Sequence, residues 1–373
     1  MTNQRLLLLS VSAGAGHVRA AEAIRVHAEQ RGDDLTVRHI DVMDFVPKGF
    51  RTLYTDYYLK LVSTAPALWG YLYQVTNEAE PDSASQKLRR ALERLNTRPL
   101  LKEIAAFAPD KIVCTHFLPA EILSRQVRKG ILNSPVWVQV TDFDLHRMWV
   151  IPHMTGFFAA SEEVAYLMRA QGIPPAAIHV TGIPIMPVFA QAPDRLTCLK
   201  ENGLDAQRPV ILLMGGGAGI GSLETVAERL LALDHDFQLI ALAGKNASTL
   251  AALQQLATRH PGRLWPQGFT HQVERLMACA DLVVTKPGGL TTSECLALGL
   301  PMIINSPIPG QEERNADYLL EQGAALKAIN ALTLEYRIRW LLDHPDQLAV
   351  MRERARRLGR PGAAVDVLRH VLG

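Results

Sequence analysis

The sequence predicts an α/β fold made of two doubly wound domains. Short apolar runs alternate with longer segments of helical spacing along its 373 residues, which is typical of parallel sheets covered by helices on both faces. Each half also places a glycine-rich turn after its first strand, at Gly14–Gly16 and at Gly215–Gly217. The chain is longer than one hydrophobic core usually organises, so two domains are expected.

The strands are predicted from short apolar runs that end at turn residues. In the first half these runs are 6–11, 111–115 and 136–141, and in the second half 210–214, 237–243, 282–285 and 302–305. Segments 20–30 and 222–233 follow two of them with helical spacing. This order of strand and helix predicts a parallel sheet in each half.

The domain boundaries follow from a change in composition. A stretch rich in proline and polar residues, 186–208, is predicted to be a linker. We therefore assign 1–185 to an N-terminal domain and 209–350 to a C-terminal domain. A last helix in 351–373 is expected to pack back on the N-terminal domain.

Composition and charge exclude several classes of protein. The formal net charge of +2 gives no basic surplus for binding nucleic acid. Cys114, Cys198, Cys279 and Cys295 lie far apart, without metal spacing or a disulfide framework, which suits a reducing cytosol. No signal peptide and no run of about 20 apolar residues is found, so any membrane contact is expected to be peripheral.

Two glycine turns in the second half have the composition of phosphate-binding loops. One is Gly215–Gly217, and the other lies in "TKPGGLTTSE" (285–294), which adds hydroxyl side chains to the first turn of a helix. Small residues let backbone N–H groups approach an anion, although such glycines also serve close helix–sheet packing. Glu294 can accept hydrogen bonds from the two hydroxyls of a ribose, or interact with the helix dipole. Gln311, Glu312 and Asn315 follow a proline-glycine turn and suit sugar hydroxyls or a solvated helix start.

Several ordered motifs resemble one known family. "TKPGGLTTSE" followed by "PIPGQEERNADYLLEQGAA" is similar to the donor half of the diacylglycerol glycosyltransferases. These are the bacterial processive glucosyltransferases and the plant monogalactosyldiacylglycerol synthases, related to the enzyme that adds N-acetylglucosamine to the peptidoglycan lipid precursor. "SAGAGHVRAAEAI", "TDFDLHRMWV" and "VTGIPIMPVF" resemble the bacterial branch, so the resemblance runs from about Leu6 to Ala325.

The resemblance implies the GT-B glycosyltransferase fold, two Rossmann-like domains facing a cleft. The donor, a UDP-sugar, would bind mainly to the C-terminal domain, and the acceptor would enter from the N-terminal one. Carried over residue by residue, the donor site would use Gly288, Gly289 and Thr291 at the diphosphate, Glu294 at the ribose, Gln311 and Glu312 at the sugar, Phe269 at the uracil, and Gly216 and Gly217 along the cleft.

The turn with Gly14, Gly16 and His17 would face the acceptor in this fold. A helix N-terminus disfavours imidazolium, so the ring of His17 is expected to be neutral near pH 7. A neutral imidazole can take the acceptor's hydroxyl proton as that oxygen attacks the anomeric carbon. The alternatives are that His17 binds substrate or caps its helix, and that Asp142 is the base or orients His17. His116, at a strand end, either lines the acceptor path or has a capping or core role.

Asp142 and Asp144 form an Asp-x-Asp motif, which holds a divalent metal in the other major glycosyltransferase fold. Here the motif follows a strand of the first half, with His146 nearby and the donor motifs far away in sequence. We therefore expect a structural or cleft-lining role for it, and no metal or other cofactor.

A lipid acceptor would require a membrane-facing surface. Residues 45–75 contain eight of the 23 aromatic residues, Trp69 among them, and the next predicted helix carries Arg89, Arg90 and Arg94. Aromatic residues suit a headgroup interface and basic residues attract anionic lipid, although a buried core and a solvated face are the simpler interpretations. We expect a cytoplasmic protein held peripherally at the inner face of the cell membrane.

These observations predict an inverting, metal-independent hexosyltransferase. The donor is a UDP-sugar, with glucose preferred over galactose, and the acceptor is diacylglycerol or a glycosyldiacylglycerol. The alternatives are transfer to another lipid or a small hydrophobic acceptor, a UDP-sugar 2-epimerase, and a nucleotide-sugar or lipid binding module without turnover. No nucleic acid partner is expected.

Overall fold

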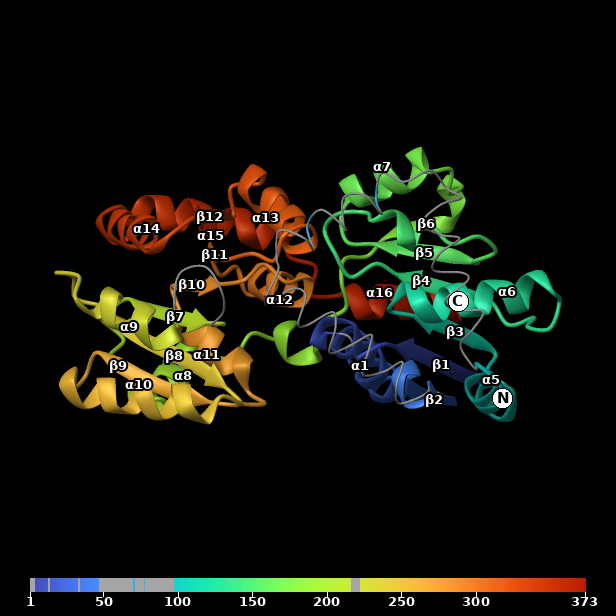
Figure 1. Ribbon diagram of the computed structural model, residues 1–373, viewed down its shortest axis with the longest axis horizontal. Helices are drawn as coiled ribbons and strands as arrows, with labels where there is room; N and C mark the ends of the chain where they lie inside the picture. The colour runs from blue at the N-terminus through green and yellow to red at the C-terminus, as the bar shows by residue number, and fades with distance from the viewer. Residues whose placement is uncertain are drawn as a thin grey trace. The chain divides into compact units, whose positions relative to one another are not determined.

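The computed structural model describes residues 4–12, 14–32, 34–46, 70, 77, 97–215 and 222–373. They divide into two compact units (Figure 1). The first contains Met1–Pro187, Pro309–Gln311 and Arg360–Gly373, and the second contains Val188–Ile308 and Glu312–Gly359. Each unit is built on one six-stranded sheet in which all neighbouring strands run parallel. The predicted α/β class with two doubly wound sheets is therefore confirmed.

The sheet of the first unit has the order β2-β1-β3-β4-β5-β6. Its strands are β1 Gln4–Ser10, β2 Leu35–Asp41, β3 Lys111–Cys114, β4 Val136–Gln139, β5 Gly156–Ala159 and β6 Ile178–Val180. Leu6, Leu7, Leu8 and Leu9 are completely buried, as a central strand covered on both faces requires. The chain runs outwards from β1 to β2 and then resumes at β3 on the other side. The switch point of this sheet therefore lies between β1 and β3, where open α/β sheets bind ligands.

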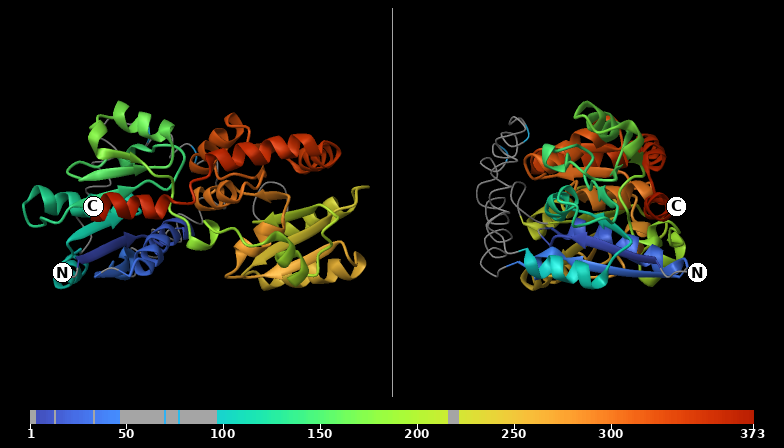
Figure 2. Two further views of the ribbon diagram at one scale, coloured as in Figure 1. Left: turned by 180° about the vertical axis from the view of Figure 1, so that it is seen from behind. Right: turned by 90° about the vertical axis from the view of Figure 1, so that its right-hand side faces the viewer.

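The helices of the first unit include one from the far end of the sequence. Among the described residues they are α1 Ala15–Gln30, α5 Arg98–Phe107, α6 Phe117–Arg128, α7 Glu162–Ala170 and α16 Ala363–Leu372, with 3₁₀ helices at Val42–Asp44, Arg147–Trp149 and Pro175–Ala177. A further 3₁₀ helix, Pro187–Phe189, begins with the last residue of this part of the first unit. Helix α16 packs against α1, and its residues Val367, Leu368 and Val371 are buried in one cluster with Leu6 and Ile24. Figure 2 shows this red helix among the blue and teal elements of the first unit.

The sheet of the second unit has the order β12-β11-β10-β7-β8-β9. Its strands are β7 Val210–Met214, β8 Gln238–Gly244, β9 Leu264–Gly268, β10 Leu282–Thr285, β11 Met302–Asn305 and β12 Ala325–Ala328. Its helices are α8 Arg195–Glu201, α9 Leu223–Leu231, α10 Ala247–Arg259, α11 Val273–Cys279, α12 Gly289–Leu298, α13 Gln311–Glu321, α14 Ala331–Asp343 and α15 Pro345–Leu358. The switch point here lies between β7 and β10.

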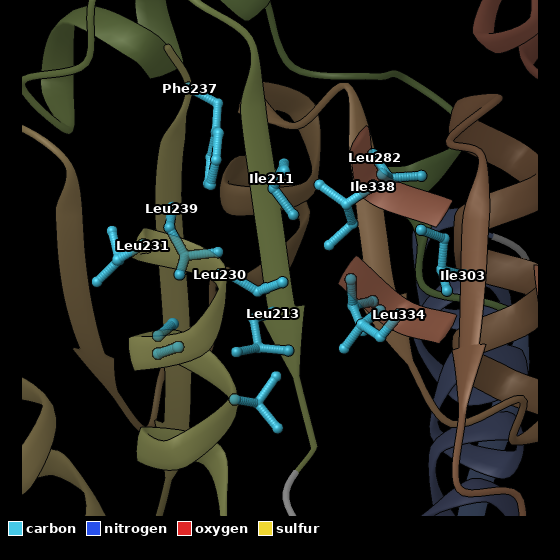
Figure 3. Packing of buried hydrophobic residues seen from close by; sticks show 14 of the residues in the cluster. Ile211, Leu213, Leu230, Leu231, Phe237, Leu239, Leu282, Ile303, Leu334 and Ile338 are labelled. Atoms are coloured by element: carbon cyan, nitrogen blue, oxygen red, sulfur yellow. The ribbon is translucent and has the colours of Figure 1, made fainter. Parts of the chain in front are cut away.

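The core of the second unit lies between this sheet and its covering helices (Figure 3). Leu213 of β7 and Leu239 of β8 belong to one buried cluster with Leu230 of α9. Leu334 and Ile338 of α14 join the same cluster. Burial of such side chains stabilises a fold by about 1.5–3 kcal/mol each.

A single carboxylate at the start of β10 joins three elements of the second unit. Oδ2 of Asp281 accepts hydrogen bonds from the backbone N–H of Val210 at 3.0 Å and from Nη2 of Arg195 at 2.8 Å. Oδ1 accepts one from Nη2 of Arg352 at 3.1 Å. Asp281 thus holds α8 and α15 to the first strand of the sheet.

None of the helices in the described ranges has both the length and the apolar character needed to cross a bilayer.

Candidate active site

Two histidines lie at the switch point of the first unit. Strand β1 leads into the turn before α1, whose first turn contains His17, and β3 leads into Thr115 and His116. These strands are neighbours, with Leu9 paired to Cys114, so the segments that follow them meet at the same edge of the sheet. The rings of His17 and His116 contact each other edge to face, with centroids 4.5 Å apart and planes at 86°.

The hydrogen bonds of His17 determine which ring nitrogen carries its proton. Nδ1 lies 3.0 Å from the backbone carbonyl oxygen of Thr115 and 2.9 Å from Oγ1 of Thr141. A carbonyl oxygen can only accept, so Nδ1 carries the proton and Nε2 keeps its lone pair. Oγ1 of Thr115 also donates to the backbone carbonyl of His17 at 2.8 Å. Thr115 therefore fixes both the backbone and the ring of His17.

Burial makes His17 a weak base in the folded protein. Desolvation of the ring lowers the pKa of His17 to about 4, and the hydrogen bond to Thr115 opposes this only in part. The imidazole is therefore neutral at pH 7. A lowered pKa was expected from the helix N-terminus, but burial is the dominant cause here.

His116 begins helix α6 and is almost completely buried, with 3% of its surface exposed. Its Nδ1 accepts a hydrogen bond from the backbone N–H of Leu118 at 3.0 Å, which makes it the N-cap of the helix. Burial, together with the neighbouring His17, holds the pKa of His116 well below its usual value. Both histidines are therefore neutral at pH 7.

Aromatic side chains surround the pair of histidines. The ring of Phe117 lies 4.1 Å from that of His116, and Trp149 lies 6.1 Å from His17 and 6.2 Å from His116, measured between centroids. Sequence reasoning did not assign Phe117 or Trp149 to the site, although Phe117 directly follows His116 and Trp149 lies within the motif "TDFDLHRMWV". Gly14 is the exposed N-cap of α1, and Gly16 lies in its first turn.

The Asp-x-Asp motif lies in the first unit as well. Asp142 is buried, and its Oδ1 accepts a hydrogen bond from Nε2 of Gln311 at 2.6 Å, within the same unit. His146 caps the 3₁₀ helix Arg147–Trp149, because its Nδ1 accepts from the backbone N–H of Met148 at 3.2 Å. Across the described ranges, no three His, Cys, Asp or Glu side chains gather as a metal site requires.

A second candidate site lies at the switch point of the second unit. Strand β10 leads through Lys286 and Pro287 to Gly288, which is the N-cap of α12. Gly288, and Gly14 at the N-cap of α1, provide no side-chain capping bond, and the described helices α5, α11, α15 and α16 also lack one. Helices α6, α7, α8, α9, α10 and α14 each receive one. The N-terminal N–H groups of α12 therefore stand without a side-chain cap, as anion binding requires.

Glu312 lies beside this helix N-terminus. A Cβ atom added to Gly288 would stand 3.8 Å from Oε1 of Glu312, while Oε2 accepts a hydrogen bond from the backbone N–H of Ile308 at 2.7 Å. Burial raises the pKa of Glu312, and the Ile308 hydrogen bond and the nearby charge of Lys286 oppose that shift. Sequence reasoning had not selected Lys286.

The hydroxyls of helix α12 differ from the expectation that all of them flank its free N–H groups. Oγ of Ser293 donates back to the carbonyl of Gly289 at 2.8 Å, and Thr292 is completely buried. Thr291 keeps part of its surface exposed, and Glu294 is 6% exposed. Asn315, on α13, is completely buried, so it is not part of a solvated helix start.

Phe269 follows β9 and is 54% exposed. Nζ of Lys245, at the end of β8, lies over its ring at 4.9 Å from the centroid, and His271 meets the ring edge to face at 4.8 Å. Sequence reasoning missed Lys245, because only the pairing of β8 with β9 brings it to Phe269. It also missed His271, which follows Phe269 by two residues. The predicted residues Gly216, Gly217, Trp69, Arg89, Arg90 and Arg94 lie outside the described residues.

Comparison with known proteins extends across both units. Residues 17–185 match the monogalactosyldiacylglycerol (MGDG) synthase family, and residues 210–365 match the glycosyltransferase family 28 C-terminal domain. The monogalactosyldiacylglycerol synthase of Spinacia oleracea is 30% identical over 380 residues, which cover 98% of this chain and 71% of that protein. This chain belongs to the monogalactosyldiacylglycerol synthase family of glycosyltransferases. The resemblance predicted from the motifs is therefore confirmed.

The bacterial branch of the family matches over the full length. The processive diacylglycerol beta-glucosyltransferase of Bacillus pumilus (strain SAFR-032) is 28% identical over 375 residues, covering 100% of this chain and 95% of that protein. Among solved structures, MurG of Acinetobacter baumannii has a TM-score of 0.63 at 16% identity, covering 100% of this chain and 99% of that one. UDP-GlcNAc 2-epimerase of Neisseria meningitidis has a TM-score of 0.61 at 14% identity, covering 99% of each. These structures share the fold, which confirms the predicted GT-B class, whereas family membership identifies a glycosyltransferase.

Proposed function

We propose that this glycosyltransferase moves a hexose from a UDP-sugar to diacylglycerol or a glycosyldiacylglycerol, with inversion at the anomeric carbon. The observation that carries the proposal is the neutral His17, held through Nδ1 so that the lone pair of Nε2 remains available. The names of the relatives supply the acceptor and both sugars. Glucose is preferred because "TDFDLHRMWV" resembles the bacterial branch.

In this mechanism Nε2 of His17 takes the proton of the acceptor hydroxyl. The acceptor oxygen attacks the anomeric carbon from the face opposite the leaving group, and the bond from that carbon to the diphosphate oxygen breaks. The electron pair of that bond leaves with UDP. The uncapped N–H groups of α12 and the ammonium of Lys286 stabilise the negative charge that develops on the diphosphate.

The donor assignments follow the family resemblance. Gly288, Gly289 and Thr291 contact the diphosphate, and Glu294 holds the ribose. Gln311 and Glu312 contact the transferred hexose. Phe269 offers an exposed ring to the uracil. Gly216 and Gly217, which lie outside the described residues, are assigned to the cleft by the resemblance alone.

The assignment of Glu294 is tested with two nucleotides. Glu294→Ala is expected to weaken UDP binding by about 1.5–3 kcal/mol, the range for hydrogen bonds to a charged group. Calorimetry should find a much smaller loss for 2′,3′-dideoxyuridine diphosphate, which lacks both ribose hydroxyls. Equal losses for the two ligands would rule out the ribose contact. Because Glu294 is buried, the melting temperature of the variant must first be shown to be close to wild type.

We also propose peripheral binding to an anionic membrane surface at the inner face of the cell membrane. The support is sequence composition alone, since Trp69 and the arginines lie outside the described residues. Reversing the charge at Arg89, Arg90 and Arg94 should reduce sedimentation with anionic vesicles, because each basic residue near such a surface contributes about 1 kcal/mol. Added salt should act in the same direction, while UDP affinity stays constant. Unaltered vesicle binding would assign docking to another surface.

The overall reaction is tested by measuring UDP release with and without diacylglycerol, and by mass spectrometry of the lipid product. The proposal requires release that depends on diacylglycerol, together with a hexose added to the lipid. Conversion of UDP-sugar without any acceptor would favour an epimerase. UDP release that depends only on another lipid or a small hydrophobic alcohol would mean that this compound, and not diacylglycerol, is the acceptor. Binding of the UDP-sugar without turnover would contradict the proposal.

A further inference from the structure

The two histidines at the switch point of the first unit are held in opposite tautomers. Nδ1 of His17 donates to the carbonyl of Thr115, so its proton is on Nδ1. Nδ1 of His116 accepts from the backbone N–H of Leu118, so the proton of this neutral ring is on Nε2. Nε2 is therefore an acceptor in His17 and a donor in His116.

Neither Nε2 atom has a hydrogen-bond partner in the described part of the chain. His116 is nevertheless 97% buried, as its exposed fraction of 3% implies. Buried polar groups in native proteins nearly always have a partner, so the N–H of His116 suits a bound ligand.

We propose that His116 is a second catalytic residue, which donates a hydrogen bond from Nε2–H to the hydroxyl oxygen whose proton is taken by Nε2 of His17. This inference rests on the proposed function. An alcohol is the ligand class that fits, because one hydroxyl group both donates and accepts. The ring contact, with centroids 4.5 Å apart, brings the two side chains to the same place.

The donor role of His116 matters most as the reaction proceeds. The acceptor oxygen becomes more negative as its proton moves to His17, so a hydrogen bond to that oxygen strengthens towards the transition state. His116 stays neutral in that step, since a charge on His17 disfavours a second charge beside it. His17 removes the proton, and His116 orients the oxygen lone pair that forms the new bond.

The tautomers can be observed directly in the full chain labelled with ¹⁵N-histidine. Two-bond ¹H–¹⁵N spectra at pH 7 should show a protonated Nδ1 for His17 and a protonated Nε2 for His116. The variants His17→Gln and His116→Gln assign the two rings among the 12 histidines. Adding UDP and micellar dioctanoylglycerol should shift the Nε2 signals of both rings. A protonated Nδ1 in His116, or an Nε2 signal that does not respond to the alcohol, would overturn the proposal.

Two substitutions separate the role of His116 as a hydrogen-bond donor from its role as the N-cap of α6. His116→Asn places an amide oxygen where Nδ1 accepts from Leu118 but removes the ε nitrogen, and asparagine is a good N-cap. His116→Gln keeps an N–H donor near the ε position and loses the cap. We expect His116→Asn to melt near wild type and to lose turnover by about 10- to 100-fold, the effect of one hydrogen bond to a charged group. His116→Gln should be less stable yet turn over faster than His116→Asn.

His146 provides the matched control. It is 4% exposed and caps a 3₁₀ helix through an equivalent Nδ1 bond, so His146→Asn should keep its cap and lose less turnover than His116→Asn. Full turnover in His116→Asn would mean that His116 acts only as a helix cap, and it would overturn the inference. If turnover still depended on His17 in that case, the proposed function would remain intact. If the wild-type chain does not glycosylate diacylglycerol at all, the proposed function itself fails.

Discussion

His17→Ala is expected to lower turnover by about 10²–10⁴-fold, the usual contribution of a general base. UDP-sugar affinity should stay near wild type, because the donor residues belong to other elements of the chain. His17→Gln should be nearly as impaired as His17→Ala. Glutamine can hydrogen-bond the acceptor hydroxyl, but it cannot take a proton at neutral pH.

The pH profile tests the same residue without a substitution. Only the neutral ring accepts a proton, so turnover at saturating substrates should rise with pH through the pKa of His17 and then level off. Burial lowers that pKa to about 4, so the plateau should extend across neutral pH. If turnover instead rose near pH 6.5, the ring of His17 would be hydrated in the complex with substrate.

Three outcomes would contradict the role of His17. High activity in His17→Gln would make the imidazole a substrate-binding group and Asp142 the better candidate for the base. A loss of folding in His17→Ala, seen in its melting temperature, would point to a structural role through Thr115 and Thr141. An equal loss of UDP-sugar affinity and turnover would indicate that His17 belongs to the donor site.

Asp281→Ala is expected to destabilise the second unit by about 2–4 kcal/mol. Removing one partner of a buried ion pair costs about 3–5 kcal/mol. The cost is smaller here because the side chains of Arg195 and Arg352 are 36% and 34% exposed, so water can hydrate both guanidinium groups once the carboxylate is gone. The backbone N–H of Val210 also loses its acceptor.

Denaturant unfolding followed by circular dichroism measures this loss. Asp281→Asn keeps an oxygen acceptor for Val210 and should cost less than Asp281→Ala. Glu353→Ala removes the partner of Arg357 in a surface pair within α15, and should change stability by less than about 1 kcal/mol. Similar effects for Asp281→Ala and Glu353→Ala would contradict the view that Asp281 joins three elements. A fit to more than one transition is needed if the two units unfold separately.

The strands that could be predicted are mostly the central ones. β7, β10 and β11 were predicted to the residue, because a strand covered on both faces is a continuous apolar run. The unpredicted strands β2, β6, β9 and β12 are the four edges of the two sheets. Edge strands pair on one side only, so they keep polar residues such as His39 and even Pro266, which break the apolar pattern. The remaining unpredicted strand, β5, is four residues long.

The candidate site, like the strands, could be predicted from the sequence only in part. His17 and His116 could be selected from the sequence because each follows a predicted strand. The hydrogen bonds that fix their tautomers could not be predicted, since Thr115 and Thr141 reach His17 only through the order of β1, β3 and β4 in the sheet. The dominant role of burial in the pKa of His17 could not be predicted either, because desolvation depends on packing between segments far apart in sequence.

The place of α16 in the first unit has a consequence for the order of events during synthesis. The core of that unit needs Val367, Leu368 and Val371, which leave the ribosome after every residue of the second unit. The second unit can complete its own core earlier, even though most of the first unit is made before it. Until α16 has been synthesised, the apolar surface around Leu6 and Ile24 therefore lacks its covering helix. At this stage the nascent chain most needs a chaperone, because exposed apolar surface promotes aggregation.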